Sequence, residues 1–154
     1  MQIIRLIYAS HAHPEIGYDN LTQIMSSSAE HNERHGISGL LCYSGGAFLQ
    51  ALEGRRPVVN QIYNRIARDT RHTEPEILCC GPIEVRSFIE WSMKMISWDE
   101  GYAPQRRALV LRHSGMQTFE PWTMTGPQAH GFLRELAELE RRKDLRDLSE
   151  LNVV

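Results

Sequence analysis

The stretch Gly36-Ile-Ser-Gly-Leu-Leu-Cys-Tyr-Ser-Gly-Gly-Ala-Phe-Leu-Gln-Ala-Leu-Glu-Gly54 consists of two apolar runs that are joined by Gly45-Gly46. A pair of glycines between two such runs is a strong hairpin signal, because a tight two-residue turn needs positive φ angles, which glycine adopts without steric cost. The pattern therefore predicts one strand over residues 39–44 and a second strand over residues 47–53.

Side chains of the second strand alternate between the two faces of the sheet. Phe48, Gln50 and Leu52 share one face, so that one amide lies among large apolar groups. A buried amide that lacks a hydrogen-bond partner costs about 1 to 3 kcal/mol. Gln50 is therefore expected to have partners, which are either protein groups, as for an ordinary core glutamine, or a bound molecule.

Composition excludes several classes of protein. The 154 residues with 42% hydrophobic content suffice for one domain with a real core and an appendage. The net charge of −2 argues against nucleic acid as the main ligand, and no apolar run is long enough to span a bilayer. The three cysteines form no disulfide framework, and no secretory leader is evident. We therefore expect a cytoplasmic protein with reduced thiols that binds neither nucleic acid nor membranes.

The N-terminal segment of residues 3–10 reads as a strand in which Tyr8 shares a face with aliphatic side chains. A buried tyrosine hydroxyl needs a partner, and the bland interpretation is an ordinary core tyrosine. His11 and His13 follow at a spacing that could bind a metal on a strand, but no third ligand lies nearby in the sequence. The sequence therefore predicts a solvated loop there and no metal site.

A first helix is predicted from Asn20, which with Gln23 has the form of an N-terminal cap, up to Gly36. The apolar stripe of this helix turns polar at Ser28 and Asn32, with His31 beside them. Such a stripe either frays toward solvent or lines the polar end of a pocket.

A second helix is predicted after Gly54, because Pro57 stands where a first helical turn tolerates proline. Its stripe also ends in polar residues, with Arg65 followed by Asp69-Thr-Arg71-His72. On spacing alone this is a solvated helix end, which the helix dipole favours for cationic side chains.

Two further strands are predicted over residues 76–81 and 91–96, and Trp91, Met93 and Met95 are expected on one face of the second. The order strand, helix, hairpin, helix, strand, strand is that of a ferredoxin-like α+β sandwich. We expect a mixed five-stranded sheet with two helices on one face, followed by a C-terminal helical segment. In that topology the first and third strands are neighbours, so Tyr8 and Gln50 converge on one cleft below the two polar-ended helices.

Five separated motifs together closely resemble the BLUF domain, the flavin-binding blue-light photoreceptor module. The resemblance covers about residues 1–98. The motifs are Leu6-Ile-Tyr8-Ala-Ser10, the helix end with Ser28, His31 and Asn32, the hairpin from Gly36 to Gly54, Asp69-Thr-Arg71-His72, and Trp91-Ser-Met93.

The resemblance implies a non-covalent oxidised flavin between the two helices, usually FAD, with FMN or riboflavin as alternatives. It implies that Tyr8 is the light-driven electron and proton donor and that Gln50 is a hydrogen-bond switch, with Trp91 and Met93 beside it. Illumination is then expected to give a small, reversible red shift. The cofactor-binding residues implied in this way are Tyr8, Ser28, His31, Asn32, Gln50, Arg65, Asp69, Arg71, His72 and Met93.

The rest of the chain lacks room for a catalytic output domain. Pro104, Gly115, Pro121 and Gly126-Pro127 indicate loops, and Phe132, Leu133, Leu136 and Leu139 indicate an amphipathic helix. We expect residues 129–139 to pack on the open face of the sheet. The leucines beyond the charged run Arg141-Arg142-Lys143-Asp144, which are Leu145, Leu148 and Leu151, suit a dimer or effector interface.

The expected organisation is thus a photosensor domain over residues 1–100 and an extension over residues 101–154 for signalling or oligomerisation. The protein is expected not to be an enzyme, to signal to a downstream effector protein and to form a homo-oligomer. Two alternatives stay open, a small flavin-dependent enzyme and a cofactor-free ferredoxin-like interaction module in which Tyr8 and Gln50 only satisfy each other.

Overall fold

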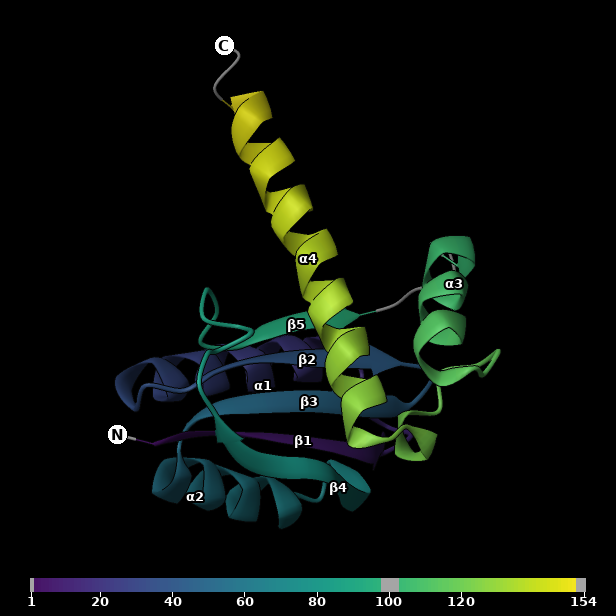
Figure 1. Ribbon diagram of the computed structural model, residues 1–154. Coiled ribbons are helices and arrows are strands. Elements are labelled where there is room, and N and C mark those ends of the chain that lie inside the picture. Colours follow the sequence, from purple (N-terminus) through teal and green to yellow (C-terminus); the bar gives the residue numbers. More distant parts are fainter. Residues whose placement is uncertain (1, 98–102, 152–154) are drawn as a thin grey trace.

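The computed structural model describes residues 2–97 and 103–151 of the chain. Its elements are β1 (Ile3–Ala12), α1 (Tyr18–Arg34), β2 (Ser38–Ser44), β3 (Ala47–Arg55), α2 (Arg56–Ala67), β4 (His72–Ile83), β5 (Lys94–Ser97), α3 (Ala103–Ser114), the short 3-10 helix η2 (Pro121–Thr123) and α4 (Gly126–Leu151). Figure 1 shows them along the chain. The boundary expected between residues 100 and 101 lies outside the described residues.

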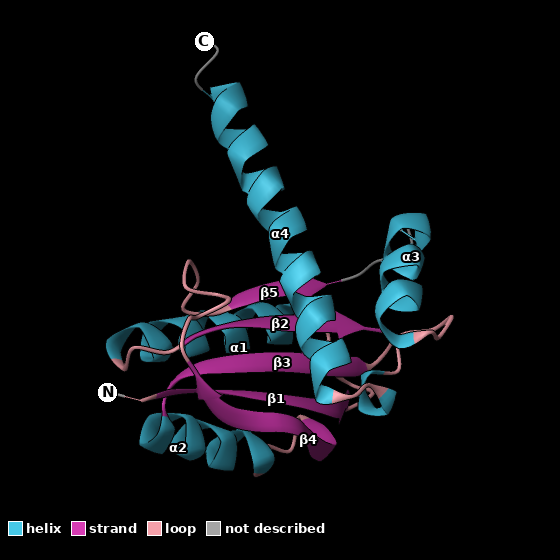
Figure 2. Cartoon of the chain, in the orientation of Figure 1, coloured by secondary structure: helices cyan, strands magenta, loops and turns pink. Residues whose placement is uncertain are grey.

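The five strands form one sheet in the order β4-β1-β3-β2-β5, as Figure 2 shows. Neighbouring strands are antiparallel except β2 and β5, which are parallel. The predicted ferredoxin-like α+β sandwich with a mixed sheet is thereby confirmed. In the register of β1 and β3, Tyr8 lies directly opposite Gln50, as the topology required.

The predicted hairpin is also confirmed. Gly45 and Gly46 connect β2 to β3 with φ angles of 56° and 79°, which only glycine adopts freely. Every residue of β3 from Ala47 to Gly54 is buried. The central strand is therefore covered on both faces, and its alternating side chains feed two separate cores.

The sheet divides the hydrophobic interior into two clusters. The pocket-face cluster lies under α1 and α2 and contains Ile4, Leu6, Tyr8, Leu21, Ile37, Leu41, Phe48, Leu52, Val59, Ile62 and Met93. The opposite cluster lies under α4 and includes Leu49 and Ala51 of β3 with Phe132, Leu133, Leu136 and Ala137 of α4. Figure 1 shows α4 crossing this second face and running on past the edge formed by β5.

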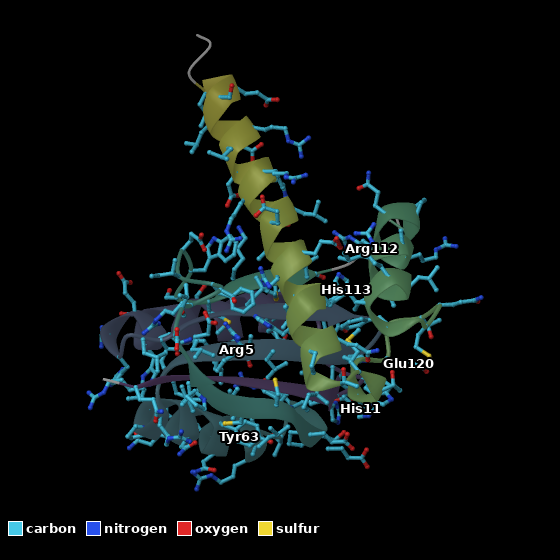
Figure 3. All side chains as sticks on the ribbon, in the orientation of Figure 1. Arg5, His11, Tyr63, Arg112, His113 and Glu120 are labelled. Atoms are coloured by element: carbon cyan, nitrogen blue, oxygen red, sulfur yellow. The ribbon has the colours of Figure 1, made fainter. Side chains whose placement is uncertain are left out.

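The C-terminal helices differ from the prediction in extent. Packing of residues 129–139 on the sheet is confirmed, but α4 continues through the charged run to Leu151, and Leu139 is 46% exposed. Pro104 and Gly126-Pro127 do not mark loops, because they lie in the first turns of α3 and α4, where proline is tolerated. The helix α3 was not predicted, and Figure 3 shows Arg112 and His113, through which it contacts Glu135 of α4.

The start of the first helix was also predicted wrongly. The helix α1 begins at Tyr18 with Gly17 as its N-cap, so Asn20 lies inside the first turn and caps nothing. The reason is that the Leu21 N–H already donates to the Gly17 carbonyl, which sets the helical register before Asn20 is reached. Among the described residues, no helix is long and apolar enough to cross a membrane.

The last strand is shorter than predicted, and this changes the direction of one side chain. Because β5 begins at Lys94, Trp91 and Met93 precede it in a bent segment and do not share a face. Met93 and Met95 lie in or against the pocket-face cluster, whereas Trp91 packs against the cluster under α4. The expectation that Trp91 lies on the same face as Met93 was wrong.

Candidate functional site

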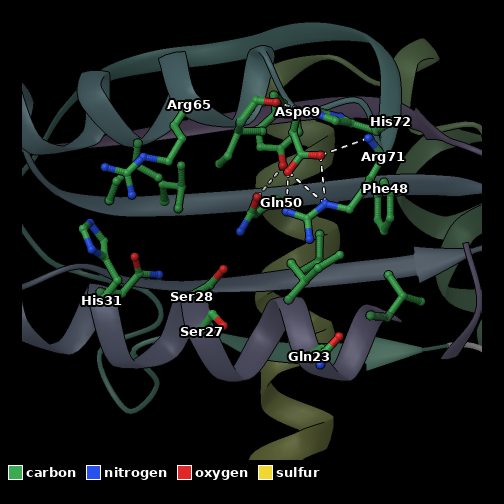
Figure 4. A pocket seen from close by; sticks show the side chains of 18 of the residues that line it. Gln23, Ser27, Ser28, His31, Phe48, Gln50, Arg65, Asp69, Arg71 and His72 are labelled. Atoms are coloured by element: carbon green, nitrogen blue, oxygen red, sulfur yellow. Dashed lines mark hydrogen bonds and ion pairs between the residues drawn. The ribbon is translucent and has the colours of Figure 1, made fainter. Parts of the chain in front are cut away.

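A cavity of about 510 Å³ opens between α1 and α2 above β1 and β3. Figure 4 looks into it and shows side chains converging from both helices and from the sheet. It brings together most of the residues that the resemblance implied, namely Tyr8, Ser28, His31, Asn32, Gln50, Arg65, Asp69, Arg71 and His72. The polar ends of both helix stripes therefore line a pocket and do not fray into solvent.

The floor of the pocket carries the cross-strand pair Tyr8 and Gln50. Their side chains are almost fully buried, with exposed fractions of 4% and 5%. The Tyr8 hydroxyl donates a hydrogen bond to Oε1 of Gln50. Burial raises the pKa of Tyr8 far above its usual range, and Tyr63 and Asp69 add to the effect. The phenol is therefore neutral at any ordinary pH and keeps the proton that it donates to Gln50 in this structure.

The amide nitrogen of Gln50 faces Met93. Its Nε2 donates to the Met93 sulfur at 3.3 Å, so Met93 contacts the predicted switch from below the pocket without lining the cavity itself. Gly39 makes room for this arrangement, because a Cβ there would lie 2.8 Å from the Met93 methyl carbon and 2.2 Å from the Ala51 carbonyl oxygen.

Asn32 brings a buried amide from the last turn of α1 to the pocket wall. It is 3% exposed, and its Nδ2 donates to the Ser92 carbonyl at 3.0 Å. Among the described residues, none donates a hydrogen bond to its Oδ1. A buried acceptor without a donor is costly, and an acceptor that borders a cavity is available to a ligand.

The segment after α2 supplies an ion pair at the opposite wall. The Arg71 Nε donates to both carboxylate oxygens of Asp69, at 2.8 and 3.0 Å, and the Arg71 backbone N–H donates to Oδ1 at 2.9 Å. These hydrogen bonds lower the pKa of Asp69, which therefore stays ionised. Asp69 thus holds the guanidinium in place through Nε and Nη2, at the wall of the cavity.

His72 connects the first strand to the end of α2. Its Nδ1 lies 2.8 Å from the Ser10 hydroxyl, and its Nε2 donates to the Ile66 carbonyl. His31 lies at the other end of the cavity and stacks on His35, with ring centroids 4.2 Å apart. Ser28, His31 and Arg65 line the more exposed part of the site. In Figure 4, Arg65 of α2 faces Ser28 and His31 of α1 across the cavity.

Several lining residues were not among the predicted site residues. Gln23 and Ser27 precede His31 at intervals of four, so the helical period would have placed them on the same line. Phe48 lies two residues before Gln50 and lines the cavity beside it. Tyr63 packs edge-on against Tyr8 with ring centroids 5.6 Å apart, and no pattern in the sequence indicated that contact.

Trp91 is the predicted site residue that the structure does not bring to the pocket. Its indole lies on the α4 side of the sheet, under the Arg141 guanidinium at 5.5 Å. No group of three or more potential metal ligands occurs within residues 2–97 and 103–151. The His11 ring lies tilted against the Trp122 ring, with ring centroids 4.1 Å apart.

Comparison with known proteins gives consistent matches. The family model described as sensors of blue-light using FAD matches residues 3–94. The photoactivated adenylate cyclase subunit beta of Euglena longa is 33% identical over 89 residues, which are 57% of this chain and 10% of that protein. The chain thus spans about a tenth of the length of that curated relative.

Two solved structures match almost end to end. The photo-activated state of BlsA superposes with a TM-score of 0.79 at 32% identity, covering 88% of this chain and 94% of that one. The dark-state structure of BlrB, a BLUF protein, gives a TM-score of 0.71 at 29% identity, covering 89% of this chain and 96% of that one. These similarities extend beyond residues 3–94 into the C-terminal helices.

Proposed function

The chain belongs to the BLUF family of blue-light sensors, and on that basis we propose that it is a photoreceptor that binds FAD between α1 and α2 and switches through Tyr8 and Gln50. The single observation that carries the proposal is the buried hydrogen bond from Tyr8 to Gln50 on the floor of the cavity. A structural pair of this kind needs no cavity, whereas this one borders about 510 Å³ of open space.

The residues present fit a flavin. The cavity volume lies within the range of about 300 to 1,000 Å³ that small-molecule sites occupy. Leu41, Leu52 and Ile62 supply apolar walls for a planar ring, and the free Oδ1 of Asn32 suits a ring N–H. Arg65 and Arg71, at different parts of the cavity lining, are cations that suit phosphate groups, which favours FAD or FMN over riboflavin.

The flavin, when bound, supplies a strong oxidant on absorption of blue light. Tyr8 would be the electron donor to the excited flavin, and its acidified phenol would pass its proton to Oε1 of Gln50 along the existing hydrogen bond. The side-chain amide of Gln50 has a donor end and an acceptor end of nearly equal shape, so it can reverse its hydrogen bonds without a change in volume. Tyr8 recovers its electron and proton, and only the hydrogen-bond pattern around Gln50 differs.

The proposed output is a protein contact and not catalysis. In the cyclase relative a sensor region of this kind forms a small part of a much longer chain. We propose that residues 1–100 act as the sensor, and that residues 101–154 signal to a separate effector protein in the cytoplasm or mediate self-association.

The test is the absorption spectrum of the purified full chain before and after blue light. We expect a yellow protein whose flavin is released on denaturation and whose spectrum shifts reversibly to the red without bleaching. Bleaching with turnover of a reductant would indicate a flavin enzyme. A colourless protein that FAD does not reconstitute would leave the cofactor-free interaction module.

A further inference from the structure

The segment between β4 and β5 connects the pocket to the opposite face of the sheet. On the pocket side it carries Met93, whose sulfur accepts from Gln50. On the α4 side it carries Glu90 and Trp91, both of which contact Arg141. Trp91 and Met93 are only two residues apart, so this short stretch of backbone joins a contact on the pocket face to a contact on the α4 face.

Arg141 contacts this segment at several points. Its Nε donates to Oε1 of Glu90 at 2.8 Å, and its Nη2 donates to Oε2 of Glu90 at 3.1 Å and to the Ser87 carbonyl at 2.6 Å. The guanidinium also lies over the Trp91 ring, 5.5 Å from its centroid. One side chain of α4 thus contacts the backbone, a carboxylate and an aromatic face of the same segment, a combination that suits arginine and not lysine.

The start of the segment is anchored from below. Glu53 is fully buried, and its carboxylate accepts hydrogen bonds from the N–H groups of Ser87 and Phe88 and from Arg5. The end of the segment is held by β2 and α1, because Gly39 N–H donates to the Trp91 carbonyl and Asn32 to the Ser92 carbonyl. Residues 89–90 lie between these anchors, are exposed, and are held by Arg141.

We propose that Arg141 is a positioning residue for the photoswitch, which holds Trp91 on the α4 face and thereby sets Met93 against the Gln50 amide. The role given to Gln50 rests on the proposed function, but the positioning of Met93 does not. Arg141 contacts neither Gln50 nor the cavity, so it acts only through the segment of residues 87–93.

The chain offers a matched control. Arg142 is the next residue on α4 and has the same charge, but its side chain is 68% exposed, and its one ion pair among the described residues is with Glu138 at 3.6 Å. Arg141→Ala removes the contacts with the segment, whereas Arg142→Ala removes an equal charge without touching it. Glu90→Gln keeps Arg141 and the volume of its partner but weakens the pair, so it decides the matter if Arg141→Ala does not fold.

The experiment is NMR on the full chain in the dark, with the wild type and its variants compared in the same flavin state. The signals are the Met93 methyl, assigned with Met93→Leu, and the Trp91 indole N–H, assigned with Trp91→Phe. We expect both signals to shift or broaden in Arg141→Ala and Glu90→Gln and to stay unchanged in Arg142→Ala. In the flavin-loaded protein, dark recovery should change about threefold or more in Arg141→Ala, which is the range of coupling through packed contacts.

Two results would overturn the proposal. Unchanged signals in Arg141→Ala and Glu90→Gln would show that Arg141 does not position the segment. A shift of the Trp91 signal alone would show a local contact that does not reach Met93. Because the variants are compared with a wild type in the same flavin state, a protein that fails to bind flavin would refute the proposed function and leave this test intact.

Discussion

Replacing Tyr8 and Gln50 singly and together separates a photochemical pair from an ordinary pair of core residues. Tyr8→Phe removes the hydroxyl that, within the described part of the chain, is the one donor to Oε1 of Gln50, at a site that is about one-twentieth exposed. The lost bond and the unpaired carbonyl should lower the free energy of unfolding by about 1 to 3 kcal/mol. Gln50→Leu leaves the Tyr8 hydroxyl unpaired, and a similar loss is expected.

The double variant is the informative one for stability. Phe and Leu leave no polar group unpaired, so the combined loss should be smaller than the sum of the two single losses, by about 1 kcal/mol or more. Urea denaturation of the flavin-free protein measures each value. Strict additivity would mean that the Tyr8–Gln50 hydrogen bond contributes nothing, which would contradict its place at the centre of the site.

Light-minus-dark difference spectra of the same variants test the function. Tyr8→Phe lacks the phenol proton and is harder to oxidise, and Gln50→Leu lacks the group whose hydrogen bonds change, so neither should show the red shift. Both should retain flavin, because the other walls of the cavity supply most of the contact area. A normal red shift in Gln50→Leu with full flavin occupancy would refute the switch and leave Gln50 as a core amide.

Three further predictions concern binding, pH and assembly. Asn32→Ala should weaken flavin binding about tenfold by removing a buried ring partner, and an unchanged dissociation constant in a fluorescence titration would contradict this. Burial and nearby arginines lower the pKa of His130 to about 4, so stability should fall as pH drops from about 6.5 toward 4; pH-dependent urea curves should show a shallower fall in His130→Gln. The leucines Leu145, Leu148 and Leu151 are 66%, 57% and 74% exposed, so replacing all three with lysine should yield a monomer of unchanged stability. A triple variant with the same molar mass as the wild type by light scattering would rule out a self-association interface at these leucines.

The part of the fold that the sequence predicted depends on strong local patterns. Two glycines fix the hairpin, and the period of two places Gln50 among apolar side chains. Once the order of elements indicated the topology, the pairing of Tyr8 with Gln50 followed, because that topology makes β1 and β3 neighbours. The polar ends of both helix stripes could not be interpreted alone, and only their convergence over one sheet face identified the pocket.

The errors arose where tertiary contacts override local signals. The form of a cap at Asn20 was present, but the chain was already helical there. The helix α3 has a weak pattern of its own, and its position depends on the burial of Leu109 and Val110 in the cluster under α4, with Arg112 and His113 contacting Glu135 at the surface. Charged residues after Leu139 indicated the end of a helix, yet good helix formers continue α4 to Leu151.

Trp91 is the most consequential error, because it changes how a signal can leave the pocket. Had Trp91 and Met93 shared a face, both would report to the flavin side, and α4 could sense the site only through the thickness of the sheet. The bend before β5 places one on each face, with Met93 against Gln50 and Trp91 against Arg141. Under the positioning role proposed for Arg141, a displacement of Met93 reaches Trp91 through the backbone of residues 91–93, whose carbonyls at Trp91 and Ser92 accept hydrogen bonds from Gly39 and Asn32. The route that this proposal predicts from pocket to C-terminal helix is a single bent segment at the edge of the sheet, and it needs no rearrangement of the central strands.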